Sequence, residues 1–247
     1  HLRLALLGVV PNLRKGTVAE ALADPRSAFS ESYRSVRTAL QFSTDRGVPK
    51  VLLVTSPSAA EGKSTTALTL ARNFAQLGKR VLLVEADLRN PSLHRVTGMR
   101  AEQGLSSLLA GAASISQVIR DTDDERLQVI LAGPLPPNPA ELLSGSRLLS
   151  MLTIAAEKYD QVIIDGPPVL GIADAPILSN VVSGTLLVVH SGKTRIKTAQ
   201  SAIKRLAAAR AHLIGGLLTH YDAKVAGYGY DYESYYAYGT TPKLGKG

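Results

Sequence analysis

The stretch VLLVTSPSAAEGKSTTALTLA, residues 51–71, decides the fold of this chain. It begins with a continuous aliphatic run, which is typical of a buried strand, and passes through small residues to Gly62-Lys63-Ser64. A helical pattern follows and ends at Gly78, a common residue just beyond a helix. A strand end followed by a helix N-terminus presents unpaired N–H groups and the helix dipole to a phosphate. This order of residues therefore predicts a phosphate-binding loop.

The types of residue in the loop fit the same chemistry. Gly62 lets the backbone approach a phosphate, Lys63 offers a positive charge to the β and γ oxygens, and Ser64 supplies a hydroxyl for Mg²⁺. The P-loop pattern G-x-x-x-x-G-K-[ST] has glycine where this chain has Pro57, so a helix that merely starts with Gly-Lys-Ser is the alternative. The predicted nucleotide ligands are Ala60, Glu61, Gly62, Lys63, Ser64 and Thr65.

Two further aliphatic runs end in acidic residues. RVLLVEADLRNPSLH, residues 80–94, places Glu85 and Asp87 at the end of one predicted strand, and YDQVIIDGPP, residues 159–168, places Asp165 at another. Each acid alone could simply cap a following helix. In an open parallel sheet, however, ligands bind beyond the carboxyl ends of the strands. Acids there, beside a phosphate loop, can hold hydrated Mg²⁺ and orient an attacking hydroxyl. We therefore predict a site for Mg·ATP or a similar nucleotide, with Ser64, Asp87 and Asp165 near the metal.

Hydrophobic periodicity predicts alternating strands and helices along most of the chain. Such alternation predicts an α/β fold of the P-loop NTPase type: a mostly parallel central sheet covered by helices on both faces. The expected division is a P-loop NTPase-type domain over 1–220, beginning with a distinct segment over 1–26, and a tail over 221–247. Strands are expected at 3–11, 50–56, 80–86, 160–166, 184–190 and 213–219, and helices at 27–43, 64–77, 141–157 and 194–210, with 12–24 irregular.

Composition narrows the possible functions. The chain has no cysteine, which excludes a disulfide framework and a thiolate metal site. Its formal net charge of +8 reflects either a solvated basic surface or an anionic neighbour such as a nucleotide or the inner membrane leaflet. No apolar run reaches the ~18–20 residues that span a bilayer. Aromatic residues are not interleaved with basic ones, so the sequence does not predict a nucleic-acid partner. Because the first residue is His1, we expect a piece of a longer polypeptide.

The C-terminal stretch GYGYDYESYYAYGTTPK, residues 227–243, contains six of the nine tyrosines in the chain. Tyrosines among Gly, Ser, Asp and Glu suit a solvated segment that can reach an active site. The alternative is a low-complexity tail whose rings stack on a partner. The tyrosines of this cluster are Tyr228, Tyr230, Tyr232, Tyr235, Tyr236 and Tyr238.

Taken together, these motifs resemble those of the bacterial tyrosine kinases that accompany polysaccharide export, a branch of the P-loop ATPases. SPSAAEGKST resembles their Walker A motif, VLLVEADLRNPSLH their Walker A′ and VIIDGPP their Walker B. AGPLPPNPAELL, residues 132–143, resembles another characteristic segment of the family. ESYRSVR matches the oligomerisation pattern E-x-x-R-x-x-R at Glu31, Arg34 and Arg37.

The resemblance implies a reaction and a role for each residue of the site. Lys63 and the loop amides would stabilise the phosphates of ATP, while Ser64 and Asp165 would organise Mg²⁺. Asp87, or less readily Glu85, would accept or orient the phenol proton of the acceptor tyrosine. Arg89 is either a phosphate ligand or part of a surface turn.

The resemblance also implies partners. Subunits would form a ring in which each subunit phosphorylates the tyrosine cluster of its neighbour. This phosphorylation would regulate capsule or exopolysaccharide synthesis and export. The expected partners are a membrane-spanning co-polymerase domain, fused or separate, and a phosphotyrosine phosphatase. The expected location is the cytoplasmic face of the bacterial inner membrane.

Two departures from the family pattern keep a non-catalytic function open, and a third position bears on a related branch of ATPases. Glu85 stands where the family commonly has aspartate, and Ala59-Ala60 stand where relatives often carry Pro-Gly. Septum-positioning and partition ATPases carry a signature lysine where this chain has Ser58, which argues against that branch. The competing hypotheses are a non-catalytic, nucleotide-responsive scaffold of the export machinery and a partition-type ATPase.

Overall fold

The computed structural model describes residues 2–13 and 15–222. In this part of the chain, eight strands form one sheet with the order β1-β8-β7-β2-β6-β3-β5-β4. Every neighbouring pair is parallel except β4 and β5 at one edge. The mostly parallel sheet predicted from the alternating pattern is therefore confirmed. The strands are β1 Leu6–Pro11, β2 Val51–Thr55, β3 Val81–Glu85, β4 Ile119–Asp121, β5 Leu127–Ile130, β6 Gln161–Asp165, β7 Gly184–His190 and β8 Leu213–Tyr221.

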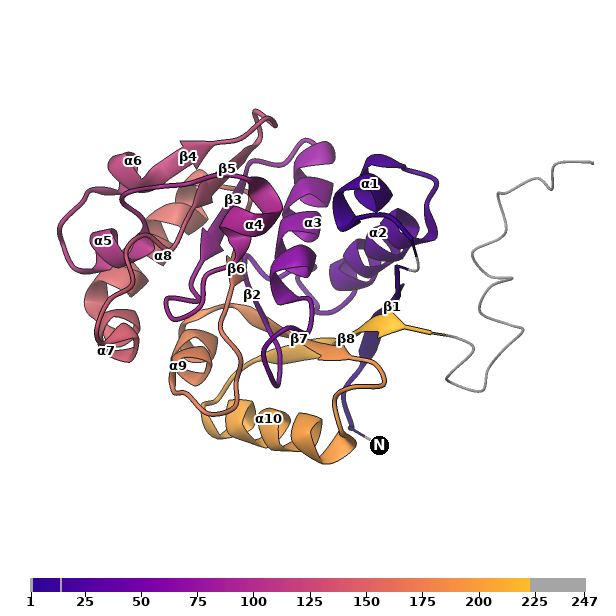
Figure 1. Ribbon diagram of the computed structural model, residues 1–247. Helices are drawn as coiled ribbons and strands as arrows, with labels where there is room; N and C mark the ends of the chain where they lie inside the picture. Colours follow the sequence, from indigo (N-terminus) through magenta and orange to yellow (C-terminus); the bar gives the residue numbers. More distant parts are fainter. Residues whose placement is uncertain (1, 14, 223–247) are drawn as a thin grey trace, which may run out of the picture.

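Helices cover both faces of this sheet, as the sequence predicts. Figure 1 shows α2 and α3 above the strands and α9 and α10 below them. The longer helices are α2 Ala28–Gln41, α3 Lys63–Gln76, α8 Ser146–Lys158, α9 Asp174–Val181 and α10 Ile196–Ala208. The shorter ones are α1 Val18–Ala23, α4 Leu93–Thr97, α5 Leu105–Leu109, α6 Ile115–Val118 and α7 Pro139–Ser144.

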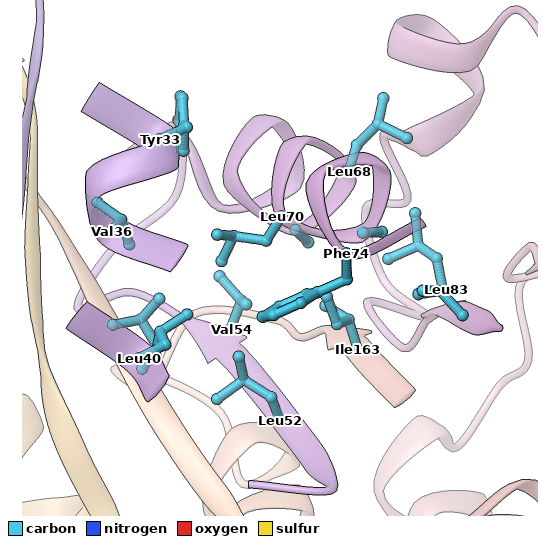
Figure 2. Packing of buried hydrophobic residues seen from close by; sticks show 14 of the residues in the cluster. Tyr33, Val36, Leu40, Leu52, Val54, Leu68, Leu70, Phe74, Leu83 and Ile163 are labelled. Carbon is cyan, nitrogen blue, oxygen red and sulfur yellow. The ribbon is translucent and has the colours of Figure 1, made fainter. Parts of the chain in front are cut away.

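The helix that begins at Lys63 is anchored by the main core cluster. Its apolar side chains recur every three to four residues, so one stripe of α3 packs onto the sheet. Phe74 is fully buried and lies among Leu52, Val54 and Ile163 of the strands (Figure 2). Burial of an aromatic ring of this size stabilises the fold by about 1.5–3 kcal/mol. Because α3 is held in this way, the loop before it has a defined position.

Three predicted boundaries differ from the structure. The expected helix over 141–157 is two helices, α7 and α8, because the backbone at Gly145 is extended. The segment 12–24 contains α1, whose first turn is held by a capping box between Thr17 and Glu20. Strands β4 and β5 were not predicted, because three and four residues are too few for a clear alternation.

Most of the predicted tail lies outside the described residues. Strand β8 runs to Tyr221, and the description ends at Asp222, so the six clustered tyrosines are not described. In the described part of the chain, every helix is too short or too polar to cross a bilayer.

Candidate nucleotide-binding site

The loop between β2 and α3 takes a conformation that glycine favours. Gly62, the residue before α3, has φ 89°, in the left-handed region where a side chain is strained. A Cβ atom at this position would also lie 3.4 Å from Cγ2 of Thr219. Ala60 has φ 59°, which costs roughly 1 kcal/mol for a residue with a side chain. This conformation accounts for the glycine that relatives often carry at the same position.

The Glu61 side chain faces the protein interior and ties the loop to the sheet. It is 1% exposed; Oε1 accepts a hydrogen bond from the Ser58 N–H at 2.8 Å and Oε2 one from the His190 N–H at 3.0 Å. The Thr219 hydroxyl donates to the Glu61 carbonyl at 2.8 Å. Both carboxylate oxygens and the carbonyl of Glu61 are thus engaged, so only its main-chain N–H is available to bind a phosphate. Glu61 occupies a variable position of the loop motif, so the motif alone does not reveal this anchoring role.

Lys63 and Ser64 open the first turn of α3. Lys63 is largely buried, and within the described residues its ammonium group has no hydrogen bond or ion pair. The Ser64 Oγ lies 2.6 Å from Oγ of Ser92, which immediately precedes α4. This contact joins the loop to the segment that follows β3. An ammonium group without a protein partner, carried by a largely buried side chain at the start of a helix, is suited to an anion.

Asp165 is the last residue of β6 and lies between the ends of β2 and β3, where its register partners are Val54 and Glu85. It is 1% exposed, and neither carboxylate oxygen has a hydrogen-bond partner in the described chain. Burial raises the pKa of Asp165 to about 7, although the nearby Ser64 hydroxyl and the Lys63 charge oppose this rise. Buried polar atoms without partners are uncommon, so this carboxylate is suited to a cation.

The Glu85 carboxylate is occupied by the backbone of two neighbouring loops. Oε1 accepts hydrogen bonds from the N–H groups of Ser92 and Leu93, both at 2.6 Å, and Oε2 accepts one from Ala132 at 3.0 Å. Glu85 therefore holds the start of α4 and the loop after β5 in place. The extra methylene, compared with aspartate, lets the carboxylate reach these amides, so the geometry favours a positioning role over proton transfer.

Asp87 keeps one carboxylate oxygen available. Its Oδ1 accepts hydrogen bonds from the N–H groups of Asn90 at 3.0 Å and Arg89 at 3.3 Å. Its Oδ2 accepts none from the described residues. Of the two acids in this segment, Asp87 is thus the one with a free oxygen for a metal or a proton.

Arg89 pairs with an acid that the sequence did not single out. Its Nε donates to Oδ2 of Asp174 at 2.8 Å and its Nη2 to Oδ1 at 3.0 Å. Asp174 is fully buried at the start of α9, and this bidentate hydrogen bonding raises the pKa of Arg89. Arg89 therefore links the segment after β3 to α9. These two residues are 85 positions apart, so no local pattern could reveal the pair.

The residues of the oligomerisation pattern lie on α2, away from the nucleotide loop. Arg34 hydrogen-bonds to Glu31 within the helix and to the carbonyl of Pro25. The Nη1 of Arg37 donates to the Asn73 carbonyl at 3.5 Å, while its Nε is buried without a partner in the described chain.

The acids fit Mg²⁺ that arrives with a nucleotide. Among the described residues there is no cluster of three or more His, Asp or Glu that could hold a metal. Mg²⁺ in nucleotide sites needs no such cage, because it keeps several waters and is held by one or two carboxylates and the phosphates. The unpartnered oxygens of Asp165, the free Oδ2 of Asp87 and the Ser64 hydroxyl meet this requirement.

Comparison with known proteins shows which family shares this arrangement. The model of the AAA domain family AAA_31 matches residues 50–207. The tyrosine-protein kinase YwqD of Bacillus subtilis is 42% identical over 198 residues, which cover 80% of this chain and 84% of YwqD. The chain belongs to the bacterial tyrosine-protein kinases. The expected family is thus confirmed.

Solved structures of bacterial tyrosine-protein kinases have the same fold. The kinase domain of Escherichia coli tyrosine kinase ETK has a TM-score of 0.81 and 30% identity, over 87% of this chain and 90% of that domain. The chimerical protein CapA2B2 has a TM-score of 0.82 and 31% identity, over 89% and 96% of the two chains. Because this likeness extends over most of the chain, the P-loop kinase fold predicted from the motifs is confirmed.

Bacterial tyrosine-protein kinases differ in length. This chain spans most of YwqD, but it covers 27% of the full-length tyrosine-protein kinase etk of Escherichia coli, to which it is 34% identical. Family membership implies nucleotide binding, typically with Mg²⁺. The roles of individual residues and the partners of this chain are taken up as proposals below.

Proposed function

We propose that this chain transfers the γ-phosphoryl group of ATP to tyrosine hydroxyls, with its own C-terminal tyrosine cluster as acceptor. Family membership supports the reaction type. The observation that carries the site assignment is that three charged groups with atoms free to bind a ligand lie at neighbouring strand ends, where the charges of Lys63 and Asp87 act on Asp165. These are the Lys63 ammonium, the Asp165 carboxylate and the Asp87 Oδ2, beside β2, β6 and β3 respectively.

Each group has a role that follows from its charge and position. Lys63 and the N–H groups from Ala60 to Thr65 would bind the phosphates and stabilise the charge that develops on them. Mg²⁺, held by Ser64 and Asp165 together with the phosphates, would supply further neutralisation of that charge, while Asp87 lies beside the metal and keeps its Oδ2 for the phenol proton. Asp165 fits this role through its buried oxygens, directly or through water.

In the proposed step, the phenol oxygen forms a bond to the γ-phosphorus as the bond from that phosphorus to the β,γ-bridging oxygen breaks. The phenol proton passes to Oδ2 of Asp87, and ADP leaves. General-base assistance of this kind typically contributes ~10²–10⁴-fold to the rate. Glu85 receives a positioning role in this proposal, because its oxygens already accept three backbone hydrogen bonds.

The acceptor cluster would be presented by a neighbouring subunit. A tail tethered within an oligomer reaches a neighbour's site at an effective concentration of ~1 mM, so even weak contacts are sufficient. The match of Glu31, Arg34 and Arg37 to the oligomerisation pattern of the family supports a ring. Each phosphate adds about −1.5 to −2 charges, so six would add roughly ten negative charges to a basic chain and weaken its assembly.

The proposed setting is polysaccharide synthesis and export at the cytoplasmic face of the bacterial inner membrane. A membrane-spanning co-polymerase domain, fused or separate, would recruit the kinase, and a phosphotyrosine phosphatase would reverse the reaction. The family resemblance supports this setting.

A comparison of three proteins tests the proposal. The purified chain, its Lys63→Met variant and a chain ending at Tyr221 are incubated with Mg·ATP and probed for phosphotyrosine. We expect a signal that requires both Lys63 and the tail. ATP hydrolysis without phosphotyrosine would favour a partition-type ATPase, and nucleotide binding without turnover would favour a non-catalytic scaffold.

A further inference from the structure

One cavity is lined by none of the residues assigned to nucleotide or metal binding. It is formed by α5, the proline-rich loop after β5 and α7, and it has a volume of about 470 Å³. Its lining is mainly apolar and includes Pro134, Leu135, Pro136, Pro137 and Leu142. Cavities of this size accommodate small ligands or single side chains.

One polar group in this cavity is unsatisfied. Ser106 lines the cavity and is 4% exposed, and its hydroxyl has no hydrogen-bond partner among the described residues. The other polar side chains around it are already engaged. Asn138 donates to Glu141 at 3.2 Å, and Ser107 accepts from the Gly104 N–H at 3.3 Å. A buried hydroxyl without a partner costs free energy unless an occupant completes its hydrogen bonding.

The cavity is rigidly connected to the acids of the proposed active site. Ala132 is two residues before Pro134, which lines the cavity. The N–H of Ala132 donates a hydrogen bond to Glu85. The N–H of Ser106 in turn donates to the Ala132 carbonyl at 2.9 Å. The close contact of Gly104 with this loop leaves no room for a side chain, because a Cβ there would lie 2.2 Å from the Leu131 carbonyl oxygen. The cavity wall is therefore hydrogen-bonded to Glu85, which is two residues before Asp87 in the chain.

The chemistry of this cavity selects an occupant. A flat apolar ring packs well against prolines and leucines, and a hydroxyl on that ring could pair with Ser106, a combination that tyrosine offers. Leu135 is 62% exposed at the cavity mouth and would be covered by such a ring. The chain itself supplies six tyrosines within residues 228–238, outside the described part.

We propose that this cavity, lined by Ser106 and Leu135, docks one tyrosine of another copy's C-terminal cluster while a second tyrosine of that cluster reacts at Asp87. This inference rests on the proposed function and defines its preferred substrate class: acidic, glycine-containing segments that carry at least two tyrosines. It explains how a cluster can be a better acceptor than a single tyrosine, because each docked ring presents its neighbours to the active site.

Kinetics with peptides in trans test the docking. The full chain with Tyr→Ala at all six cluster positions serves as the enzyme, so that its own tail does not compete. One substrate is a peptide of residues 225–243, and the other is the same peptide with a single tyrosine retained. We expect the multi-tyrosine peptide to have a KM at least ~10-fold lower than the single-tyrosine peptide, after correction for the number of acceptors.

Two cavity variants and one control identify the docking site. Leu135→Asp should raise KM for the multi-tyrosine peptide ~10-fold or more, leaving kcat and the single-tyrosine KM unchanged. Ser106→Ala should raise the KM for the multi-tyrosine peptide ~2–10-fold, which corresponds to the loss of one hydrogen bond. Leu149→Asp is the matched control, because Leu149 is 55% exposed on α8 and does not line the cavity. Unchanged KM values in both cavity variants, with catalysis intact, would overturn the docking proposal.

A binding measurement separates failure of the docking from failure of the kinase assignment. Fluorescein-labelled peptide is titrated against the same enzyme carrying Lys63→Met, and binding is followed by anisotropy. Loss of affinity in Leu135→Asp, but not in Leu149→Asp, supports the docking site even if no peptide is phosphorylated. Equal affinity in all variants overturns it, whatever the kinase assay shows.

Discussion

At the residue scale, Asp165 makes the stability of the nucleotide-free protein depend on pH. Its pKa is about 7 in the folded protein and ~3.9 in an unfolded chain, so the folded state binds the proton more tightly. The resulting stabilisation is complete below pH ~4 and is lost as pH rises through ~7. Asp165→Asn should therefore stabilise the protein at pH 8 by a few kcal/mol, on the order of its pKa shift, and by much less at pH 4.

Urea unfolding of the nucleotide-free protein at several pH values measures this effect. The exposed Asp45→Asn substitution serves as the control, since it should leave the pH dependence unchanged. The same pH dependence in Asp165→Asn as in the unaltered chain would contradict the assignment of this buried carboxylate.

Glu61 provides a second prediction for a single residue. Glu61→Gln replaces one of two buried acceptor oxygens with an NH₂ group, so either the Ser58 or the His190 N–H loses its partner. We expect a loss of about 1–3 kcal/mol in stability. ATP affinity should also fall, because the loop amides are no longer held in place. Thermal unfolding measures the change in stability and calorimetric titration the change in ATP affinity. Glu157→Gln, at an exposed position, is the control. Equal ATP affinity in the two variants would show that Glu61 does not organise the loop.

Residue identities could be predicted where a motif determines their position. Lys63, the first residue of α3, and Asp165, the last residue of β6, lie where the loop and strand-end patterns place them. The inward-facing side chain of Glu61 and the three amides held by Glu85 could not be predicted. Their partners include His190 and Ala132, which approach only once the sheet has assembled.

At the scale of the elements, the ion pair between Arg89 and Asp174 connects the segment after β3 to α9. Arg89→Ala leaves a fully buried carboxylate unpaired, which we expect to destabilise the fold by about 2–4 kcal/mol. Arg89→Lys should lose part of this, because lysine cannot form the bidentate pair. Urea unfolding measures both variants. Adding Asp174→Asn to Arg89→Ala should recover part of the lost unfolding free energy. If the effects of the two substitutions on the unfolding free energy were fully additive, a direct interaction would be contradicted.

Elements were predictable in proportion to their length and regularity. The spacing of apolar residues locates α3 within one residue at each end, because one full stripe of the helix packs on the sheet. The break between α7 and α8 depends on the extended backbone at Gly145, and β5 on pairing with β3 across 46 residues of chain. Neither feature has a local periodic signal.

At the scale of the whole molecule, the proposed ring of subunits depends on contacts made by α2. The contact between Arg34 and Glu31 is an exposed pair within one helix, worth only ~0.3–0.5 kcal/mol to the single subunit. Arg34→Ala with Arg37→Ala also removes the hydrogen bonds to the Pro25 and Asn73 carbonyls, so we expect a further loss of about 1–3 kcal/mol in the unfolding free energy. The folded double variant should nevertheless lose oligomer mass and tail phosphorylation. Light scattering after size exclusion measures the mass, with the exposed Arg195→Ala as control. Unchanged mass and phosphorylation would show that α2 does not form the interface.

The central claim is that the groups at the ends of β2, β3 and β6 transfer phosphate to the clustered tyrosines. Mass spectrometry of the intact chain and of its C-terminal peptides, before and after incubation with Mg·ATP, tests it most directly. The account predicts added phosphate within residues 228–238 of the unaltered chain and none in Lys63→Met. ATP consumption with that segment wholly unmodified would contradict it.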